Sequence, residues 1–281
     1  MRLASPIAAL LAAVLAFAVL PAAAQGCGSA EAPCRVPLGT YRVALPEDPA
    51  AGPRPVLVHF HGGGRSGSMV VANPVFRPFL DAGWVVVAPD GLAREGASWL
   101  GWNLYIPNGG RTRDEPAFAR QVLEDAARRF GVDRRRAVAS GYSVGGSAIW
   151  NIACRAPDLF HAWLPVAGGF WRPHPEVCAG PVRLLHVHGW QDGTVPLEGR
   201  PIRGVRLQGD VFEGLQVWRA VNGCESPKAD LVAVDGPYWT RSWTGCAAGS
   251  LTMLLHPGGH SIPAWWPETA MAWLSRRAAL R

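Results

Sequence analysis

The chain has 281 residues, and 49% of them are hydrophobic, which excludes an intrinsically disordered protein and suits one domain with a large core. Its formal net charge is +6, but the 27 Lys and Arg residues are scattered and no nucleic-acid-binding motif accompanies them. Even the local cluster Arg134-Arg135-Arg136 therefore indicates a solvated surface, and we expect no nucleic-acid partner.

The N-terminus has the pattern of a secretory signal. Arg2 precedes an apolar run over 3–20, and three alanines at 22–24 offer a cleavage site. We therefore predict a signal peptide at 1–24 and a single domain at 25–281, in a secreted or periplasmic protein.

This segment has two alternative interpretations, a membrane anchor and a lipoprotein signal. A transmembrane anchor is disfavoured because the run is rich in Ala and is interrupted by Pro6, so we expect no stable membrane insertion after cleavage. Lipidation of Cys27 stays open. Gly26-Cys27 resembles the end of a lipoprotein signal, but Ala24 stands where such signals usually carry Leu.

Six cysteines follow the predicted cleavage site, and an even number in an exported chain indicates disulfide bonds. Six cysteines allow about fifteen connectivities, which the sequence leaves open, and we expect each to pair with its neighbour along the chain. No two are spaced as Cys-x-x-Cys, so a zinc or thioredoxin-like site is disfavoured. The expected pairs are Cys27 with Cys34, Cys154 with Cys178, and Cys224 with Cys246.

Apolar runs and helical spacings alternate along the rest of the chain. The first strand alternates as an antiparallel edge strand does, whereas the later ones are continuous apolar runs, as buried parallel strands are. This alternation indicates a mostly parallel central sheet with helices on both faces, and active groups in such sheets gather beyond the carboxyl ends of the strands. In chain order we expect strand 39–45, strand 55–60, helix 73–82, strand 84–88, helix 115–130, strand 136–140, helix 146–154, strands 162–167 and 182–187, helix 211–221, strand 250–255 and helix 267–279.

The pentapeptide Gly141-Tyr142-Ser143-Val144-Gly145 lies between a predicted strand and a predicted helix. A serine at such a turn has an exposed hydroxyl above the helix N-terminus, and the flanking glycines suit a turn at which backbones crowd. An ordinary glycine-rich turn is the alternative. The strand-turn-helix setting favours Ser143 as a nucleophile.

A serine nucleophile needs a base, normally a histidine that a buried carboxylate orients. Asp192 and His260 each follow a predicted strand, and both come after the serine. The order serine, aspartate, histidine is that of the α/β-hydrolase fold, which is the fold class we predict. Asp90 and His256 are the rivals, and we prefer Asp192 and His260 because they occupy the expected positions along the chain.

Acyl transfer also needs hydrogen-bond donors for the oxyanion that develops in the transition state. The segment His61-Gly62-Gly63-Gly64 follows strand 55–60, and its glycines let backbone amides approach a ligand. We predict the amides of Gly63 and Val144 as the donors, although the sequence leaves open which glycine donates.

Two histidine pairs, His59 with His61 and His186 with His188, lie on strands that we expect to be neighbours. A metal site is one interpretation. We favour histidines that pack under glycine loops, because no carboxylate or thiolate ligand set completes a metal site. We therefore expect no metal and no cofactor.

The chain has 13 tryptophans, an unusual number. Aromatic loops around a site suit a sugar face, an aromatic acyl group or an apolar polymer. For substrate binding we predict Trp99, Trp190 and Trp265. We expect core positions for Trp84, Trp150 and Trp163, and loop positions near the active edge also for Trp102, Trp171 and Trp266.

Several of these segments together resemble the polyhydroxybutyrate depolymerase and feruloyl esterase group of exported α/β-hydrolases. The resemblance runs from about Cys34 to the C-terminal helix. It implies triad roles for Ser143, Asp192 and His260, and a disulfide between Cys224 and Cys246. The segments that carry it are His61-Gly62-Gly63-Gly64, Ala88-Pro89-Asp90-Gly91, Gly141-Tyr142-Ser143-Val144-Gly145-Gly146, His188-Gly189-Trp190-Gln191-Asp192 with Val195-Pro196, Asn222-Gly223-Cys224, Trp243-Thr244-Gly245-Cys246, and Gly258-Gly259-His260-Ser261-Ile262-Pro263.

We therefore predict a serine carboxylic-ester hydrolase that acts on a small-molecule or oligomeric ester, of the feruloyl, acetyl or hydroxyalkanoate type. The alternative is a non-catalytic carbohydrate- or polymer-binding protein on the same fold, since fold does not fix function. A complete triad counts against that alternative. The sequence leaves the acyl and alcohol specificity and the oligomeric state open.

Overall fold

The computed structural model describes residues 26–48, 52–94, 96, 98–107 and 110–276 of the chain. Its strands are β1 (Cys34–Val36), β2 (Gly39–Ala44), β3 (Arg54–Phe60), β4 (Val85–Pro89), β5 (Leu92–Ala93), β6 (Leu100–Gly101), β7 (Val132–Tyr142), β8 (Ala162–Val166), β9 (Arg183–Gly189), β10 (Pro201–Ile202), β11 (Arg206–Leu207), β12 (Leu231–Asp235), β13 (Tyr238–Trp243) and β14 (Ser250–His256). Its helices are α1 (Gly67–Val71), α2 (Arg77–Asp81), α3 (Glu115–Phe130), α4 (Val144–Arg155), α5 (Val211–Val221) and α6 (Trp266–Ser275), with 3-10 turns η1 (Pro74–Phe76) and η2 (Pro157–Leu159).

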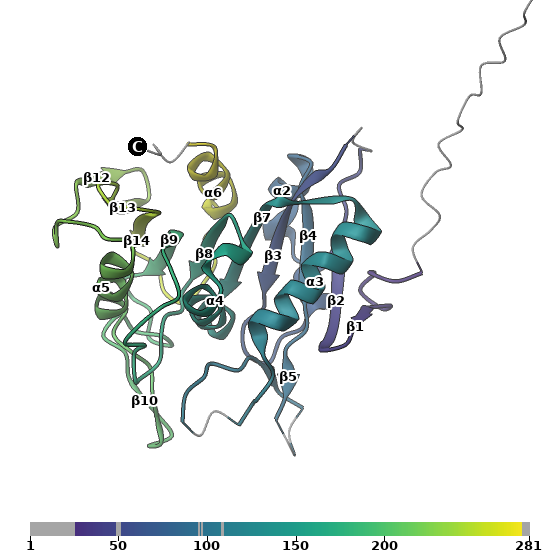
Figure 1. Cartoon of the computed structure of the whole chain (residues 1–281), viewed down its shortest axis with the longest axis horizontal. Helices are drawn as coiled ribbons and strands as arrows, with labels where there is room; N and C mark the ends of the chain where they lie inside the picture. The colour runs from purple at the N-terminus through teal and green to yellow at the C-terminus, as the bar shows by residue number, and fades with distance from the viewer. Residues whose placement is uncertain (1–25, 49–51, 95, 97, 108–109, 277–281) are drawn as a thin grey trace, which may run out of the picture.

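One large sheet runs through the centre of the molecule, with helices on both sides (Figure 1). Its strand order is β1-β2-β4-β3-β7-β8-β9-β14-β13-β12. The strands from β4 to β14 in this order are parallel, and antiparallel strands flank them at both edges. This mostly parallel sheet between two helical layers is an α/β-hydrolase fold, as the sequence predicted.

Apolar side chains fill both faces of the sheet. One core layer lies under α3, α4 and α5, where Trp150 and Trp218 are fully buried. The other lies under α1, α2 and α6 and contains Phe79 and Trp266. Because both faces are covered, β4 and β8 are buried along their whole length, which explains their continuous apolar sequences.

Local signals set the ends of the longest helix, α3. The Asp114 side chain accepts a hydrogen bond from the Ala117 amide at 3.0 Å, and Gly131 ends the helix with a left-handed φ of 63°. Helices α3 and α5 have the predicted bounds. Strand β7 begins at Val132, four residues before its predicted start at Arg136. The prediction missed this part because the first half of the strand is polar and has no apolar pattern.

The two edges of the sheet differ from the prediction. Strand β2 is not an edge strand, because β1 pairs with it antiparallel and covers it. Three residues are too few for β1 to show a pattern of its own. At the opposite edge, β12 and β13 form an unpredicted hairpin that turns at Gly236, and the exposed side chains of Val232 and Val234 give β12 no buried face.

The predicted helix 73–82 is divided in two. The Asn73 side chain accepts from the Val75 amide at 3.0 Å and caps η1, whereas α2 begins only at Arg77. Pro74 and Pro78 stand in the first turns of η1 and α2, because proline is tolerated there and disrupts a helix interior.

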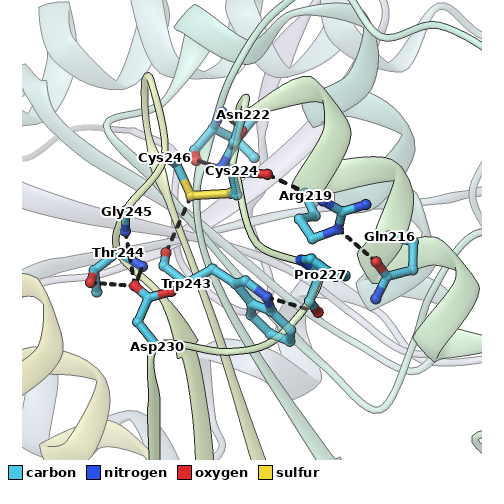
Figure 2. The surroundings of a disulfide bond; sticks show 11 residues. Gln216, Arg219, Asn222, Cys224, Pro227, Asp230, Trp243, Thr244, Gly245 and Cys246 are labelled. Carbon is cyan, nitrogen blue, oxygen red and sulfur yellow. Dashed lines mark hydrogen bonds between the residues drawn. A yellow bond between two sulfur atoms is a disulfide. The ribbon is translucent and has the colours of Figure 1, made fainter.

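Disulfides join the cysteines that are neighbours along the chain, which confirms the expected pairing. Figure 2 shows the third of these bonds, which ties the segment after α5 to the segment after β13. Asp230 fastens the same region, because its carboxylate accepts a hydrogen bond from the Gly245 amide at 2.9 Å. The three bonds are Cys27–Cys34, Cys154–Cys178 and Cys224–Cys246.

The disulfides also indicate the kind of compartment in which the protein is found. Three such bonds are typical of proteins exported to an oxidising compartment. The predicted signal peptide at 1–24 lies outside the described residues. Among the residues that are described, no helix combines the length and the apolar character needed to cross a bilayer.

Removing the third disulfide with C224A/C246A should lower the free energy of unfolding by about 3 kcal/mol, because the unfolded chain regains the freedom that the bond removes. Its sequence separation is 22 residues, against 7 for Cys27–Cys34. The matched variant C27A/C34A should therefore lose less, about 2 kcal/mol. Urea unfolding of both variants and the parent measures the losses. A larger loss for the short loop would contradict the loop-closure explanation.

Candidate active site

Three polar side chains from three strand ends meet above the carboxyl edge of the sheet. Ser143 follows β7, Asp192 follows β9, and His260 follows β14. His260 Nε2 lies 2.9 Å from Ser143 Oγ, and His260 Nδ1 lies 2.7 Å from Asp192 Oδ2. The three residues singled out in the sequence thus form one chain of hydrogen bonds.

The turn at Ser143 holds this residue in a strained backbone conformation. Its φ of 58° with ψ of −124° is disfavoured for any residue with a Cβ. A Cβ on Gly141 would lie 2.4 Å from the Gly145 carbonyl oxygen, and one on Gly145 would lie 2.0 Å from that of Phe60. Only glycine fits at both positions, which is the physical reason for the G-x-S-x-G pattern. The turn leaves Ser143 at the N-terminus of α4, whose dipole favours negative charge.

Asp192 is 4% exposed, and both of its carboxylate oxygens are engaged. Oδ1 accepts hydrogen bonds from the Thr194 and Val195 amides, at 2.9 and 2.8 Å. Oδ2 faces His260 and also lies 3.4 Å from His188 Nε2. Burial alone would raise the pKa of the Asp192 carboxyl, but hydrogen bonds from His188, His260 and Val195 outweigh it and hold that pKa well below its usual range. Asp192 is therefore ionised at neutral pH and favours one orientation of the His260 ring.

Two buried histidines stand behind Asp192. His188 Nε2 donates to the Val195 carbonyl at 2.7 Å, so this nitrogen carries a proton. His188 Nδ1 lies 3.0 Å from His186 Nε2, within hydrogen-bond distance. Burial, followed by the neighbouring His188, lowers the pKa of His186 well below its usual range and keeps it neutral. The pair packs under the loop that carries the acid.

The two histidine pairs do not lie on neighbouring strands, contrary to the prediction. β7 and β8 lie between β3, which carries His59, and β9, which carries His186. The two strands are separated because strands that follow one another along the chain are not always neighbours in a parallel sheet. The apolar pattern of each strand does not reveal the order of the strands in the sheet. His59 Nδ1 instead lies 2.8 Å from Ser140 Oγ, and His61 Nε2 accepts from the Gly91 amide at 2.9 Å. Within the described ranges, no group of three or more His, Cys, Asp or Glu side chains is arranged to hold a metal ion.

The loop that carries His260 is pinned on two sides. The Tyr142 hydroxyl donates to the His260 carbonyl at 2.8 Å, and the two ring centroids lie 4.9 Å apart. A Cβ on Gly189 would lie 2.3 Å from the Gly259 carbonyl oxygen, so the acid loop and the histidine loop pack backbone to backbone. Tyr142 could not be assigned this role from the sequence, because it fills a variable position of the pentapeptide.

The two rival residues have other partners. Asp90 accepts from the Gly67 amide at 2.8 Å and pairs with Arg42. His256 is buried, and its Nδ1 accepts from the Gly258 amide at 3.1 Å. Each of them therefore holds a loop in place.

A cavity of about 390 Å³ opens at Ser143. Gly63 and Val144, whose amides were predicted as oxyanion donors, line the same cavity. Gly63 lies directly beneath the Trp99 indole, because a Cβ on Gly63 would come within 2.2 Å of that ring. Ser143, the glycine loop and the first residue of α4 therefore border one space.

Of the three tryptophans predicted to contact substrate, Trp99 lines this cavity and two do not. Trp99 is 48% exposed, and the Arg111 guanidinium lies 5.2 Å from the centre of its ring. Trp190 packs edge-on against Trp239 at the surface, and Trp265 packs against neighbouring rings away from the cavity.

Trp171 forms a second aromatic wall of the cavity. Its indole nitrogen donates to Ser147 Oγ at 3.3 Å, which fixes the ring. Trp102 and Trp266, expected near the active edge, are buried. Trp102 nevertheless supports the site from below, because its indole nitrogen donates to the His61 carbonyl at 2.8 Å and so holds the glycine loop.

No protein-family model matches the chain. Its sequence is similar to that of "Probable feruloyl esterase C" from Aspergillus niger, with 25% identity over 231 residues that cover 78% of this chain and 75% of that protein. It is also similar to feruloyl esterase B from Piromyces equi, with 24% identity over 222 residues that cover 74% of this chain but 39% of that protein. Its fold is similar to that of an acetyl xylan esterase from Aspergillus awamori, with a TM-score of 0.61 and 15% identity over 83% of this chain and 93% of that one.

Acid should destabilise the protein through its buried histidines. Burial, with a smaller effect of His61, lowers the pKa of His59 to about 3, whereas an unfolded histidine has a pKa of about 6.5. Between these values the unfolded chain binds the extra proton. The free energy of unfolding therefore falls as the pH falls, by up to about 1.4 kcal/mol per pH unit for this residue.

Urea unfolding at several pH values between 7 and 4 tests this expectation. His59→Asn should reduce the pH slope by about one proton relative to the parent, whatever its stability at pH 7. An unchanged slope would contradict the assignment.

Proposed function

We propose that this protein, an esterase of the α/β-hydrolase group, hydrolyses carboxylic esters through Ser143, His260 and Asp192. One observation carries the proposal. The unbroken chain of hydrogen bonds from Asp192 through His260 ends on the hydroxyl of Ser143, a residue that lines a cavity.

The hydrogen-bond chain supports a two-step reaction. Ser143 Oγ attacks the ester carbonyl while His260 Nε2 takes the hydroxyl proton, which it then returns to the departing alkoxide. Water, activated by the same nitrogen, next attacks the acyl-enzyme and releases the carboxylic acid. Asp192 stays ionised throughout, holds the Nδ1 proton and stabilises the imidazolium.

For the oxyanion we propose the amides of Gly63 and Val144 as donors. Both residues line the cavity at Ser143, and Val144 is the first residue of α4, so its amide lies at the positive end of the helix dipole. Each such donor contributes about 10²- to 10³-fold to the rate. The mechanism uses no cofactor.

The walls of the cavity and the names of the relatives support a class of substrate. We propose an ester of the feruloyl, acetyl or hydroxyalkanoate type, cleaved by a secreted or periplasmic enzyme. Two indole walls, Trp99 and Trp171, favour an aromatic acyl group within this set. The names of the relatives, feruloyl esterases and an acetyl xylan esterase, support the feruloyl and acetyl types within this set.

A non-catalytic binding protein is the competing class. Such a protein could use the same indole walls, but it would have no use for a strained serine hydrogen-bonded to an oriented histidine. We therefore place hydrolysis first.

Ser143→Ala should lower kcat on a p-nitrophenyl ester by at least about 10⁴-fold, because the nucleophile is lost. It should also abolish labelling by a fluorophosphonate probe. Ser261→Ala removes an exposed hydroxyl next to His260 and serves as the matched control, which should still be labelled. No labelling of the parent would leave the binding protein as the better account, whereas labelling of the Ser143→Ala variant would contradict the assignment of Ser143 as the nucleophile.

The acyl preference can be measured as kcat/KM on methyl ferulate, acetylated xylan and a hydroxybutyrate oligomer. We expect methyl ferulate to lead, and Trp99→Ala to reduce its kcat/KM by about tenfold, since one aromatic stack is lost. Trp239→Ala, which removes an exposed indole outside the cavity, is the control. A lead for the hydroxybutyrate oligomer would instead place the enzyme with the polyester hydrolases.

A further inference from the structure

Two arginines line the cavity at Ser143, and they come from separate loops. Arg65 lies in the loop after β3, and Arg200 lies in the loop after β9. Both are exposed to solvent. No aspartate or glutamate is found among the described residues that line this cavity. Its walls therefore carry positive charge with no lining carboxylate to balance it.

Arg200 is held in place by its own surroundings. Its Nε donates to the Thr194 carbonyl at 2.9 Å and to Gln208 Oε1 at 3.3 Å. Thr194 and Gln208 line the same cavity, and Gln208 is buried. Both bonds use Nε, which leaves the terminal nitrogens of the guanidinium for a further acceptor.

Arg65 stands between two cavities. It lines the one at Ser143 and a second one of about 350 Å³, and Tyr142 and His260 line both as well. The charge of Arg65 acts on the Tyr142 hydroxyl. Burial and Asp192 raise the pKa of the Tyr142 hydroxyl, and Arg65 partly opposes them. Arg65 is therefore close enough to influence groups that contact the histidine of the site.

Two further arginines lie close to the indole rings that line the cavity. The Arg111 guanidinium lies 5.2 Å from the centre of the Trp99 ring, and that of Arg206 lies 5.9 Å from the Trp171 ring. Burial lowers the pKa of both arginines, and the charge of Arg94 lowers each further. Positive charges thus act on one another around the cavity.

Within the part of the chain that the structure describes, neither Arg65 nor Arg200 forms an ion pair with a carboxylate oxygen within 4.0 Å. Asp192 belongs to a different environment, because its side chain is fully buried and bound to His260. A concave site with walls of one charge concentrates ions of the opposite charge, and guanidinium groups bind carboxylates by charge-assisted hydrogen bonds.

We infer that, of two esters with the same shape, the site prefers the one that also carries a free carboxylate, and that Arg65 and Arg200 bind this carboxylate. The inference rests on the proposed ester hydrolysis and names its substrate class. A carboxylate can belong to the acyl portion, as in a monoester of a dicarboxylic acid, or to the alcohol portion, as in the ester of a hydroxy acid. The same two guanidinium groups serve either case.

Two matched substrate pairs test the inference. For the acyl portion, p-nitrophenyl glutarate is compared with p-nitrophenyl 4-carbamoylbutanoate, its neutral amide of nearly the same shape. For the alcohol portion, the linear dimer of 3-hydroxybutyrate is compared with its primary amide. We expect kcat/KM to favour the carboxylate by about tenfold in at least one pair at low ionic strength, and the ratio to fall as salt screens the charges.

Variants assign the preference to the two arginines. R65Q/R200Q should bring the ratio within a pair close to about one, since the neutral glutamine amides do not attract an anion. The control R35Q/R241Q makes the same change in net charge on β1 and β13, where both arginines are exposed and outside the cavity. It should preserve the ratio.

The outcomes separate the inference from the proposed function. Equal kcat/KM within both pairs overturns the inference and leaves ester hydrolysis standing. A preference that survives R65Q/R200Q overturns the assignment to these arginines. No turnover of any of the four esters, together with no fluorophosphonate labelling of Ser143, overturns the proposed function and the inference with it.

Discussion

The strained turn at Ser143 is the constraint on which the rest of the site depends. A backbone in this region costs about 1–3 kcal/mol and persists only where the surroundings hold it. Here Gly141 and Gly145 allow backbone contacts that a Cβ would block, and the Ser143 amide donates to the Val166 carbonyl at 2.9 Å, which ties the turn to β8. Helix α4 then packs across β7 and β8, so the two covered faces of the sheet keep the serine in place.

Asp192 and His260 are positioned in a different way, by the pairing of two neighbouring strands. β9 and β14 are adjacent and parallel, with His188 beside Leu255 and Gly189 beside His256 in the register. The loops that follow these strands therefore begin side by side, and their glycines let them touch. The distance between Asp192 and His260 is a property of strand pairing, whereas Ser143 reaches the pair from β7, with β8 in between.

The sequence predicted those parts of the fold that leave a local trace. Continuous apolar runs marked the buried strands, Asp114 and Gly131 marked the ends of α3, and the order of Ser143, Asp192 and His260 marked the strand ends that meet. It could not predict that β1 covers β2, since that depends on a three-residue pairing. Nor could it sort the loop tryptophans: whether an indole faces the cavity, as in Trp171, or the core, as in Trp102, is set by partners distant along the chain.

The contact between Gly63 and Trp99 has a consequence for the sequences of related proteins. The indole occupies the space that a side chain at position 63 would need, and a Cβ at Gly64 would also come within 2.7 Å of it. A homologous sequence with a larger residue in this loop cannot keep an indole in the same place. Positions 63, 64 and 99 should therefore covary among relatives, so that the aromatic wall is gained or lost together with the glycines beneath it.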